Sequence, residues 1–139
     1  MTEVDINQAV IDEFRANGGT VGGPLEYVLV LLLHHVGRRS AAPRVTPLVY
    51  QPNGTCFVIF ASNYGAPTDP DWFRNLVVYP ETEIEVGSEK VHVVARVTDG
   101  AERSQLWTRQ KEPMPNFAEY ERQTIRQIPV VVLEPRHPL

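Results

Sequence analysis

The sequence is poor in cysteine, in net basic charge and in long apolar runs. Cys56 is its one cysteine in 139 residues, which excludes an internal disulfide and a cysteine-rich zinc site. Thirteen basic residues against 17 acidic ones give a net charge of −4, so a dedicated nucleic-acid-binding domain is not expected. The longest apolar stretch, residues 28–33, is far short of the roughly 20 residues of a membrane-spanning helix. Residues 1–7 are acidic and polar, unlike a secretory signal, and we expect a cytoplasmic protein.

The N-terminal segment has the pattern of an amphipathic helix. Ile6, Val10 and Phe14 recur every four residues, which predicts a helix over residues 1–19 that ends among glycines. Two roles stay open for this helix. It covers an open end of the core, or residues 1–16 contact the inner face of the plasma membrane. Its acidic charge weighs against the membrane, because anionic lipids attract lysine and arginine.

The rest of the chain alternates short strands with short helices. Apolar or alternating runs predict strands over 26–36, 44–50, 56–61, 82–86, 90–98 and 129–134. Helices are predicted over 71–78, from 99 or 100 to about 110, and over 116–122. Strand meanders with short helices between them indicate an antiparallel β-barrel of the α+β class over residues 26–139, within a single domain that spans 1–139.

Three arginines cluster where two predicted strands meet. Arg38, Arg39 and Arg44 lie within seven residues of one another in an otherwise acidic protein. Guanidinium groups bind phosphates and carboxylates through paired hydrogen bonds, and Ser40 adds a hydroxyl. The cluster predicts a site for the anionic tail of a cofactor, and a solvated hairpin turn is the alternative.

Two further segments are candidate ligand contacts. Residues 61–66 directly follow a strand, where small and polar residues often leave backbone N–H groups free for a ligand; an ordinary loop is the alternative. On the predicted helix 71–78, Trp72 and Leu76 share a face and are interpreted as core, whereas Arg74 and Asn75 are the residues that could face a pocket.

No metal site and no hydrolase motif is expected. His34 and His35 are neighbours on a strand and point to opposite faces, so they are interpreted as packed or surface histidines. Cys56 lies in an apolar strand and is interpreted as a buried, inert thiol. The sequence contains no Gly-x-Ser-x-Gly, Walker or Gly-x-Gly-x-x-Gly motif, which leaves hydrolase and nucleotidase functions without support.

Several short motifs, each weak alone, occur in one order along nearly the whole chain. They are residues 14–19 and 22–24, Gly-Arg-Arg-Ser at 37–40, 43–48, 61–67, 70–76 with Pro80, 117–120 and 128–135. In this order and spacing the chain resembles the deazaflavin-dependent nitroreductase family of mycobacterial and actinobacterial oxidoreductases. The resemblance implies a split β-barrel related to flavin-binding barrels. It also implies coenzyme F420, a deazaflavin that bears a phosphate and an oligoglutamate tail.

The same resemblance assigns roles to individual residues. Arg38, Arg39 and Ser40 would bind the anionic tail, and Tyr120 would contribute to the substrate side of the pocket. Arg44 would lie near the phosphate and begin the pocket floor, which continues along Val45, Thr46, Pro47, Leu48 and Val49. The phosphate would be approached by Ala61, Ser62, Asn63, Tyr64 and Gly65. The residues that would pack at the cofactor are Trp72, Phe73, Arg74, Asn75 and Leu76.

One residue departs from the family's best-characterised nitroreductases. They have a lysine where Asn63 stands, and other members carry asparagine there. An asparagine keeps a neutral hydrogen bond but loses a charge-assisted one, a difference of ~1 kcal/mol.

The implied reaction is hydride transfer from reduced F420 to an apolar acceptor such as a quinone, an enone or a nitroaromatic compound. Tyr120 is the candidate catalytic residue, because its phenol can donate a proton or hydrogen bond where negative charge develops on the acceptor. Two other readings remain: a non-catalytic protein that binds F420 or a fatty acid, and a reductase that uses FMN on the same barrel. Whether the protein is a monomer or a homodimer stays open.

Overall fold

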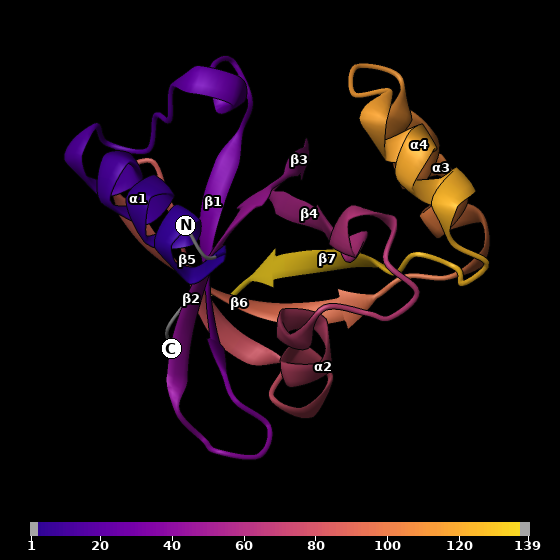
Figure 1. The fold of residues 1–139 in the computed structure, drawn as a ribbon. Helices are drawn as coiled ribbons and strands as arrows, with labels where there is room; N and C mark the ends of the chain where they lie inside the picture. Colours follow the sequence, from indigo (N-terminus) through magenta and orange to yellow (C-terminus); the bar gives the residue numbers. More distant parts are fainter. Residues whose placement is uncertain (1–2, 137–139) are drawn as a thin grey trace.

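Seven strands form one antiparallel sheet in the computed structural model, which describes residues 3–136. The order across the sheet is β2-β1-β5-β6-β7-β4-β3, and the sheet curls into a half-barrel (Figure 1). This confirms the predicted α+β class and antiparallel barrel. The strands are β1 (Val30–Val36), β2 (Pro43–Val49), β3 (Gln51–Asn53), β4 (Cys56–Phe60), β5 (Glu81–Val86), β6 (Glu89–Val97) and β7 (Val130–Pro135).

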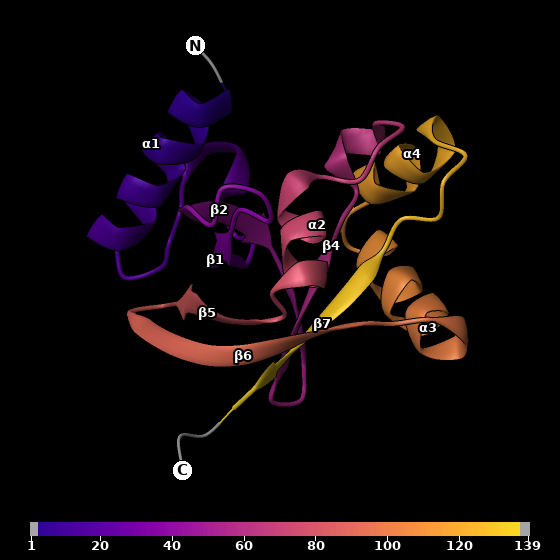
Figure 2. The ribbon, with the colours of Figure 1, turned by 90° about the horizontal axis from the view of Figure 1, so that it is seen from below.

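Four α-helices pack around this sheet (Figure 2). α1 (Glu3–Ala16) packs beside β1 and β2, and α2 (Asp71–Val78) packs on the inner face of the curled sheet. α3 (Gly100–Lys111) and α4 (Asn116–Gln123) lie together against the outer face of β4 and β7. Two short 3-10 turns, η1 (Gly23–Leu25) and η2 (Asn63–Gly65), complete the elements.

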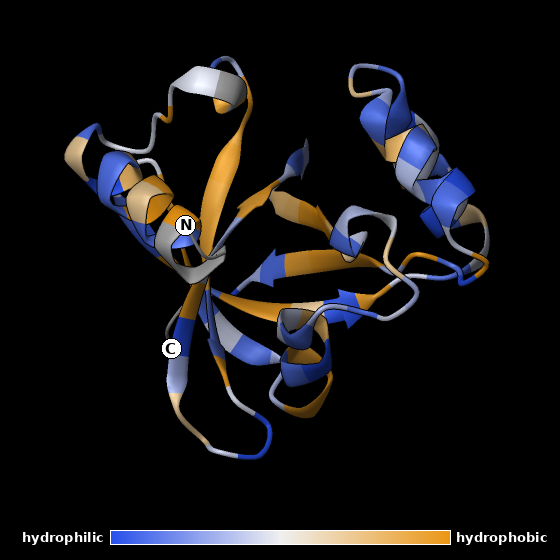
Figure 3. Cartoon of the chain, in the orientation of Figure 1, coloured by the Kyte–Doolittle hydropathy of each residue, from blue (hydrophilic) through white to orange (hydrophobic). Residues whose placement is uncertain are grey.

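Both faces of the central strands are buried, which explains their continuous apolar sequences (Figure 3). Successive side chains of a strand point to opposite faces. Leu31 and Leu33 of β1 therefore pack inside the barrel with Trp72 of α2, whereas Leu32 packs outside against Phe14 of α1. The same alternation divides β4 and β7 between the inner core and the core under α3 and α4.

The predicted strand over 26–36 begins later than expected, at Val30. Residues 23–25 form η1, and Tyr27 adopts a φ of 68°, a left-handed conformation that a strand cannot contain. The predicted helix over 1–19 likewise ends at Ala16. Gly18 and Gly19 have positive φ, and the N–H of Gly19 bonds to the carbonyl of Phe14, which is a common way to end a helix.

An ion-pair cluster attaches the end of α1 to the sheet. The guanidinium of Arg15 donates to both carboxylate oxygens of Glu85, at 3.1 and 2.8 Å, and His34 lies 2.6 Å from the same carboxylate. The hydrogen bond from Arg15 is the main cause that lowers the pKa of Glu85 to about 2. His34 is therefore a packed histidine on the face opposite His35, as the sequence predicts.

Candidate active site

The arginine cluster occupies a tight turn between β1 and β2. The N–H of Gly37 bonds to the carbonyl of Ala42 at 2.9 Å, and the N–H of Ala41 returns to the carbonyl of Gly37 at 2.8 Å. Ser40 accepts a hydrogen bond from the Ala42 N–H, which uses its oxygen within the turn. A Cβ at residue 37 would lie 2.5 Å from the Ser40 hydroxyl, so a larger residue there would force the Ser40 side chain to move.

Helix α2 holds this turn through Arg38. The backbone N–H and the guanidinium of Arg38 both donate to Asn75 Oδ1, at 3.1 and 3.0 Å, and the guanidinium also reaches Asp71 at 3.3 Å. Asn75 is 1% exposed, so these bonds are shielded from water. The structure thus brings together Arg38 and Asn75, two predicted cofactor contacts that are 37 positions apart.

The hydrogen bonds continue from Asn75 into the sheet. Asn75 Nδ2 lies 2.9 Å from His35 Nδ1, and His35 Nε2 lies 2.8 Å from the Thr46 hydroxyl on β2. Burial is the main cause that lowers the pKa of His35 to about 4, and the charge of Arg44 adds to it. His35 is therefore neutral near pH 7. Its inclusion in this network could not be predicted from the sequence, which indicated only a packed or surface histidine.

The two faces of β2 point to different surroundings. Thr46 and Leu48 lie on the side of α2, where Leu48 packs against the inner core, and Arg44 shares that face by strand alternation. Val45 packs instead with the α1 core, and Pro47 and Val49 share its face. The predicted pocket floor over 44–49 is thus divided, with three side chains toward α2 and three toward α1. Along the α2 side, the face changes from charged at Arg44 to apolar at Leu48.

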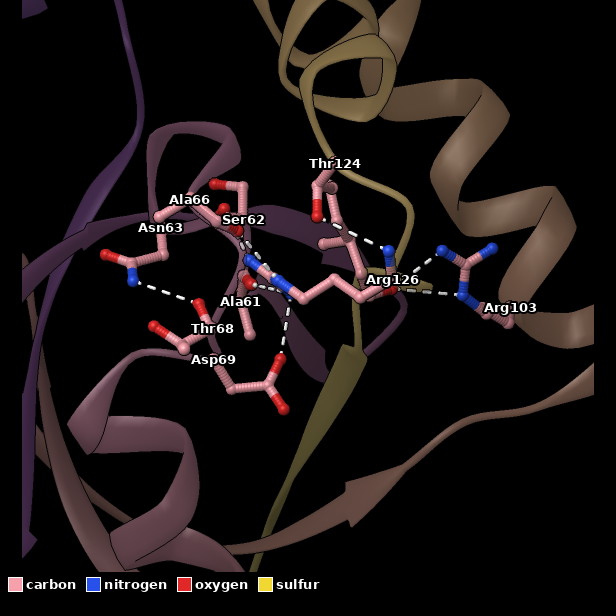
Figure 4. A network of polar contacts seen from close by, with 10 residues as sticks. Ala61, Ser62, Asn63, Ala66, Thr68, Asp69, Arg103, Thr124 and Arg126 are labelled. Atoms are coloured by element: carbon pink, nitrogen blue, oxygen red, sulfur yellow. Dashed lines mark hydrogen bonds and ion pairs between the residues drawn. The ribbon is translucent and has the colours of Figure 1, made fainter.

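The predicted phosphate-contacting loop is braced by Arg126, as Figure 4 shows. Its guanidinium donates to the carbonyls of Ala61, Ser62 and Ala66 at 2.8 to 3.1 Å and forms an ion pair with Asp69 at 2.8 Å. Only 14% of the Arg126 side chain is exposed. No local signal in the sequence identifies Arg126, because its partners lie 57 to 65 positions away.

With their carbonyls held by Arg126, the loop residues adopt an unusual backbone. Ser62 is right-handed, whereas Asn63 and Tyr64 have φ values of 48° and 56° and Gly65 one of 81°. A right-handed residue followed by a left-handed one turns successive N–H groups toward a common point, which is an arrangement that binds anions. The side chain of Asn63 donates to the carbonyl of Thr68 at 3.0 Å, so its amide group stabilises the loop itself.

The loop contacts α4 beside Tyr120. A Cβ on Gly65 would lie 2.6 Å from Gln123 and 3.1 Å from the carbonyl of Tyr120, so the close approach depends on glycine. The rings of Tyr64 and Tyr120 meet edge to face with centroids 6.0 Å apart. The Tyr120 hydroxyl oxygen accepts from Asn116 at 3.2 Å, which leaves its hydrogen able to donate to another group.

The remaining predicted residues divide into core and surface. Trp72 and Leu76 are buried, as expected for core, and with Ala61 they form part of the inner core. Phe73 is partly buried against the same core and, with Leu76, lines an apolar hollow of about 150 Å³ beside β6. Arg74 is exposed to solvent, whereas Asn75 is buried, so the two residues predicted to face a pocket together do not share one environment.

Three arginines near these elements have no carboxylate partner. Within residues 3–136, Arg39, Arg44 and Arg74 take part in no salt bridge and donate no side-chain hydrogen bond, whereas Arg15, Arg96, Arg122 and Arg126 are all paired. Unpaired cations in a protein of net charge −4 attract a negatively charged ligand. They lie on the turn, on β2 and on α2, three elements that the hydrogen bonds of Arg38, Asn75 and His35 connect.

Residues 3–136 contain neither a metal-binding cluster nor a membrane-spanning helix. No three side chains among histidine, cysteine, aspartate and glutamate are grouped so that they could hold a metal ion. In this part of the chain, none of the helices has both the length and the apolar character needed to cross a bilayer.

The curled antiparallel sheet, with its arginine-rich turn and braced loop, defines a split-barrel protein. A family model described as F420H(2)-dependent quinone reductase matches residues 7–135. Two Mycobacterium tuberculosis proteins that carry this activity in their names are each 38% identical over 109 residues. The alignments cover 78% and 76% of this chain, and 92% and 73% of the relatives. The chain therefore belongs to the F420H(2)-dependent quinone reductase family, which confirms the resemblance inferred from the sequence motifs.

Solved structures agree with this placement. A structure described as an F420-H2 dependent reductase is 30% identical, with a TM-score of 0.69, and covers 76% of this chain and 93% of its own. A second, described as a domain-swapped dimer, is 28% identical with a TM-score of 0.72 and covers 94% and 96%. A heme storage protein from Vibrio cholerae, at 18% identity and a TM-score of 0.60, shares the fold alone.

Proposed function

We propose that this protein is an F420-dependent oxidoreductase that passes a hydride from reduced F420 to an apolar quinone. The observation that carries the proposal is the surface between the β1–β2 turn, β2 and α2. It combines unpaired arginines with a strand face that becomes apolar toward Leu48. Such a gradient suits a ligand with an anionic tail at one end and a flat ring at the other.

The residues present fit this cofactor. Arg39 and Arg44 are free to bind carboxylates or phosphate, and Arg38 is held in place by Asn75. The N–H groups of Asn63 and Tyr64 lie in the left-handed loop that Arg126 braces, and they would hold the phosphate. When bound, reduced F420 supplies the hydride. The protein's part is to bind both molecules, to orient them and to keep water from the ring.

Tyr120 is the proposed donor to the acceptor oxygen. Its hydroxyl oxygen is occupied by Asn116, so the hydroxyl hydrogen can point to the substrate. A hydrogen bond to the oxygen that gains negative charge lowers the barrier to hydride transfer. We expect Tyr120→Phe to lower kcat with a quinone about tenfold while F420 binding is retained. Unchanged turnover with every acceptor tested would remove this role.

The first experiment is a titration with F420, followed by the quenching of its fluorescence. We expect saturable binding in the low micromolar range or tighter, and a loss of affinity in Arg44→Ala. Arg109→Ala removes the same charge from the exposed face of α3 and is the matched control. Oxidation of reduced F420 by a soluble quinone then measures the reaction itself.

Two results would favour the other readings. Protein that is purified with tightly bound FMN and does not bind F420 would indicate the FMN-dependent reductase. Binding of F420 or a fatty acid without turnover of any quinone, enone or nitroaromatic compound would indicate a non-catalytic binding protein.

We also propose that α1 brings the protein to a membrane surface, where apolar quinones reside. Ile6 is 50% exposed on this helix, whereas Ile11 and Phe14 are buried against the sheet. Deletion of residues 1–16 would therefore damage the core, so Ile6→Glu is the better variant. We expect it to reduce sedimentation with zwitterionic liposomes, relative to Ala9→Glu on an exposed position of the same helix. Equal sedimentation of both would contradict the contact.

A further inference from the structure

A chain of hydrogen bonds leads from Arg38 through Asn75 and His35 to Thr46. In this chain each residue donates to the next. Asn75 accepts two N–H groups of Arg38 on a single atom, and only its carbonyl oxygen can accept. The amide nitrogen of Asn75 is therefore the atom that faces His35 Nδ1, and it must donate there. His35 Nδ1 accepts this bond and carries no hydrogen.

The tautomer of His35 follows from this direction. A neutral imidazole without hydrogen on Nδ1 carries it on Nε2. His35 is 4% exposed, and its Nε2 lies 2.8 Å from the Thr46 hydroxyl. Nε2–H thus donates to Thr46 Oγ1, and the hydroxyl hydrogen must point away from His35. Within residues 3–136, no protein acceptor receives that hydrogen.

Thr46 lies where the α2-facing side of β2 changes character. Arg44 precedes it on this face and is charged and exposed, and Leu48 follows and packs on the inner core. β2 is also an edge strand of the sheet, and Thr46 is half-buried there. A ligand that bridges the charged and apolar parts of this face would pass the Thr46 hydroxyl.

We propose that Thr46 donates a hydrogen bond to the bound cofactor, and that Asn75 and His35 are positioning residues that aim this hydroxyl. The inference rests on the proposed F420-binding function and deepens it. His35 then has a role beyond packing. Because its Nε2–H occupies the oxygen of Thr46, the Thr46 hydroxyl is left to donate away from His35. The acceptor belongs to the deazaflavin ring with its side chain, or to the phosphate and its tail.

The tautomer can be tested without any cofactor. Nitrogen NMR of labelled protein near pH 7 should show His35 neutral with its hydrogen on Nε2. In Asn75→Asp the new carboxylate can only accept from His35 Nδ1, so a hydrogen should appear on that nitrogen. A wild-type His35 with hydrogen on Nδ1 would overturn the proposed direction.

The donor can be tested by binding. Thr46→Val keeps the shape of the side chain and removes the hydroxyl, and we expect about threefold to tenfold weaker F420 binding. Thr46→Ser restores a hydroxyl and should bind within about twofold of the wild type. Thr108→Val makes the same change on the exposed face of α3 and should bind as the wild type does. Thermal melts of each variant verify that it is folded, and Thr46→Ala replaces Thr46→Val if the latter does not fold.

A deazaflavin that lacks the phosphate and tail separates the two acceptors. If Thr46→Val loses the same affinity for both ligands, the acceptor is on the ring or its side chain. If it loses affinity for F420 alone, the acceptor is on the phosphate or tail. Wild-type binding with no loss in Thr46→Val overturns this inference and leaves the proposed function standing. No binding by the wild type overturns the proposed function and this inference with it.

Discussion

Asn75 Oδ1 receives two hydrogen bonds from one residue, because both the backbone N–H and the guanidinium of Arg38 donate to it. The buried amide on α2 therefore fixes the turn that carries the arginine cluster. An exposed turn rich in arginine would otherwise be mobile and would lose entropy when it binds a ligand. Because the contact already orders the turn, less entropy would be lost if the cluster binds the proposed anionic tail.

Asn75→Leu tests whether the buried amide orders the β1–β2 turn. The change removes the acceptor for Arg38 and the donor to His35, and it leaves the buried Nδ1 of His35 without a hydrogen bond. We expect a loss of about 2–4 kcal/mol in the free energy of unfolding, measured in urea, together with weaker F420 binding. Asn17→Leu, at an exposed position after α1, should change neither quantity. A stability equal to that of the wild type would contradict the described network.

Arg126→Lys tests the brace of the loop that follows β4. A lysine keeps the charge but lacks the fork that reaches three carbonyls and Asp69. We expect a loss of about 2 kcal/mol in stability and faster amide exchange over residues 61–69. Arg122→Lys alters a surface ion pair with Glu119 on α4 and is the matched control. Unchanged exchange in the loop would show that Arg126 does not order it.

Asn63→Lys introduces the cation that the best-characterised nitroreductases of the family have at this position. We expect about threefold to tenfold tighter F420 binding, since the lysine would add a charge-assisted bond to the phosphate. We also expect a loss of roughly 1 kcal/mol in stability, because Asn63 has a left-handed backbone and bonds to Thr68. Asn63→Gly also adopts this backbone and removes the Thr68 bond without adding a charge, so it is the uncharged control. Tighter binding that disappears at high salt would be consistent with the charge; no gain at low salt would contradict it.

The fold was largely predictable because each central strand is buried on both faces. Residues 31–33 of β1 and 130–133 of β7 are continuous apolar runs for this reason, and their assignment as strands is correct. The helix over 71–78 was found from its proline opening and its buried spacing of Trp72 and Leu76. The start of β1 was wrong, because a left-handed residue such as Tyr27 has no signature in the sequence.

The contacts within the candidate site could not be predicted from the sequence. Motif resemblance indicated Arg38 and Asn75, but their hydrogen bond joins residues far apart in the chain and follows only from the fold. The contacts of Arg126 with the loop likewise join residues far apart in the chain and follow only from the fold. Strand alternation could have divided Val45 from Thr46, since neighbouring residues on a strand point to opposite faces.

His35 should make the stability of the protein depend on pH. Its pKa is lowered from 6.5 to about 4 in the folded chain, mainly by burial and further by the charge of Arg44. Between these two values the unfolded chain binds a proton that the folded chain does not, so stability rises with pH across this window. The contribution is fully present above pH 6.5 and is lost as the pH falls toward 4.

Urea unfolding at pH 7 and pH 5 measures this effect, for which we expect a loss of about 2 kcal/mol in the wild type. His35→Gln is uncharged at both values and should lack this part of the loss, even where its stability at pH 7 is lower. Glu85, with a pKa of about 2, contributes its own loss mainly below pH 4.5 and so acts outside the compared interval. His92→Gln, at an exposed position on β6, should keep the wild-type dependence. If His35→Gln loses as much stability between pH 7 and pH 5 as the wild type does, the buried imidazole is not the group that causes the pH dependence.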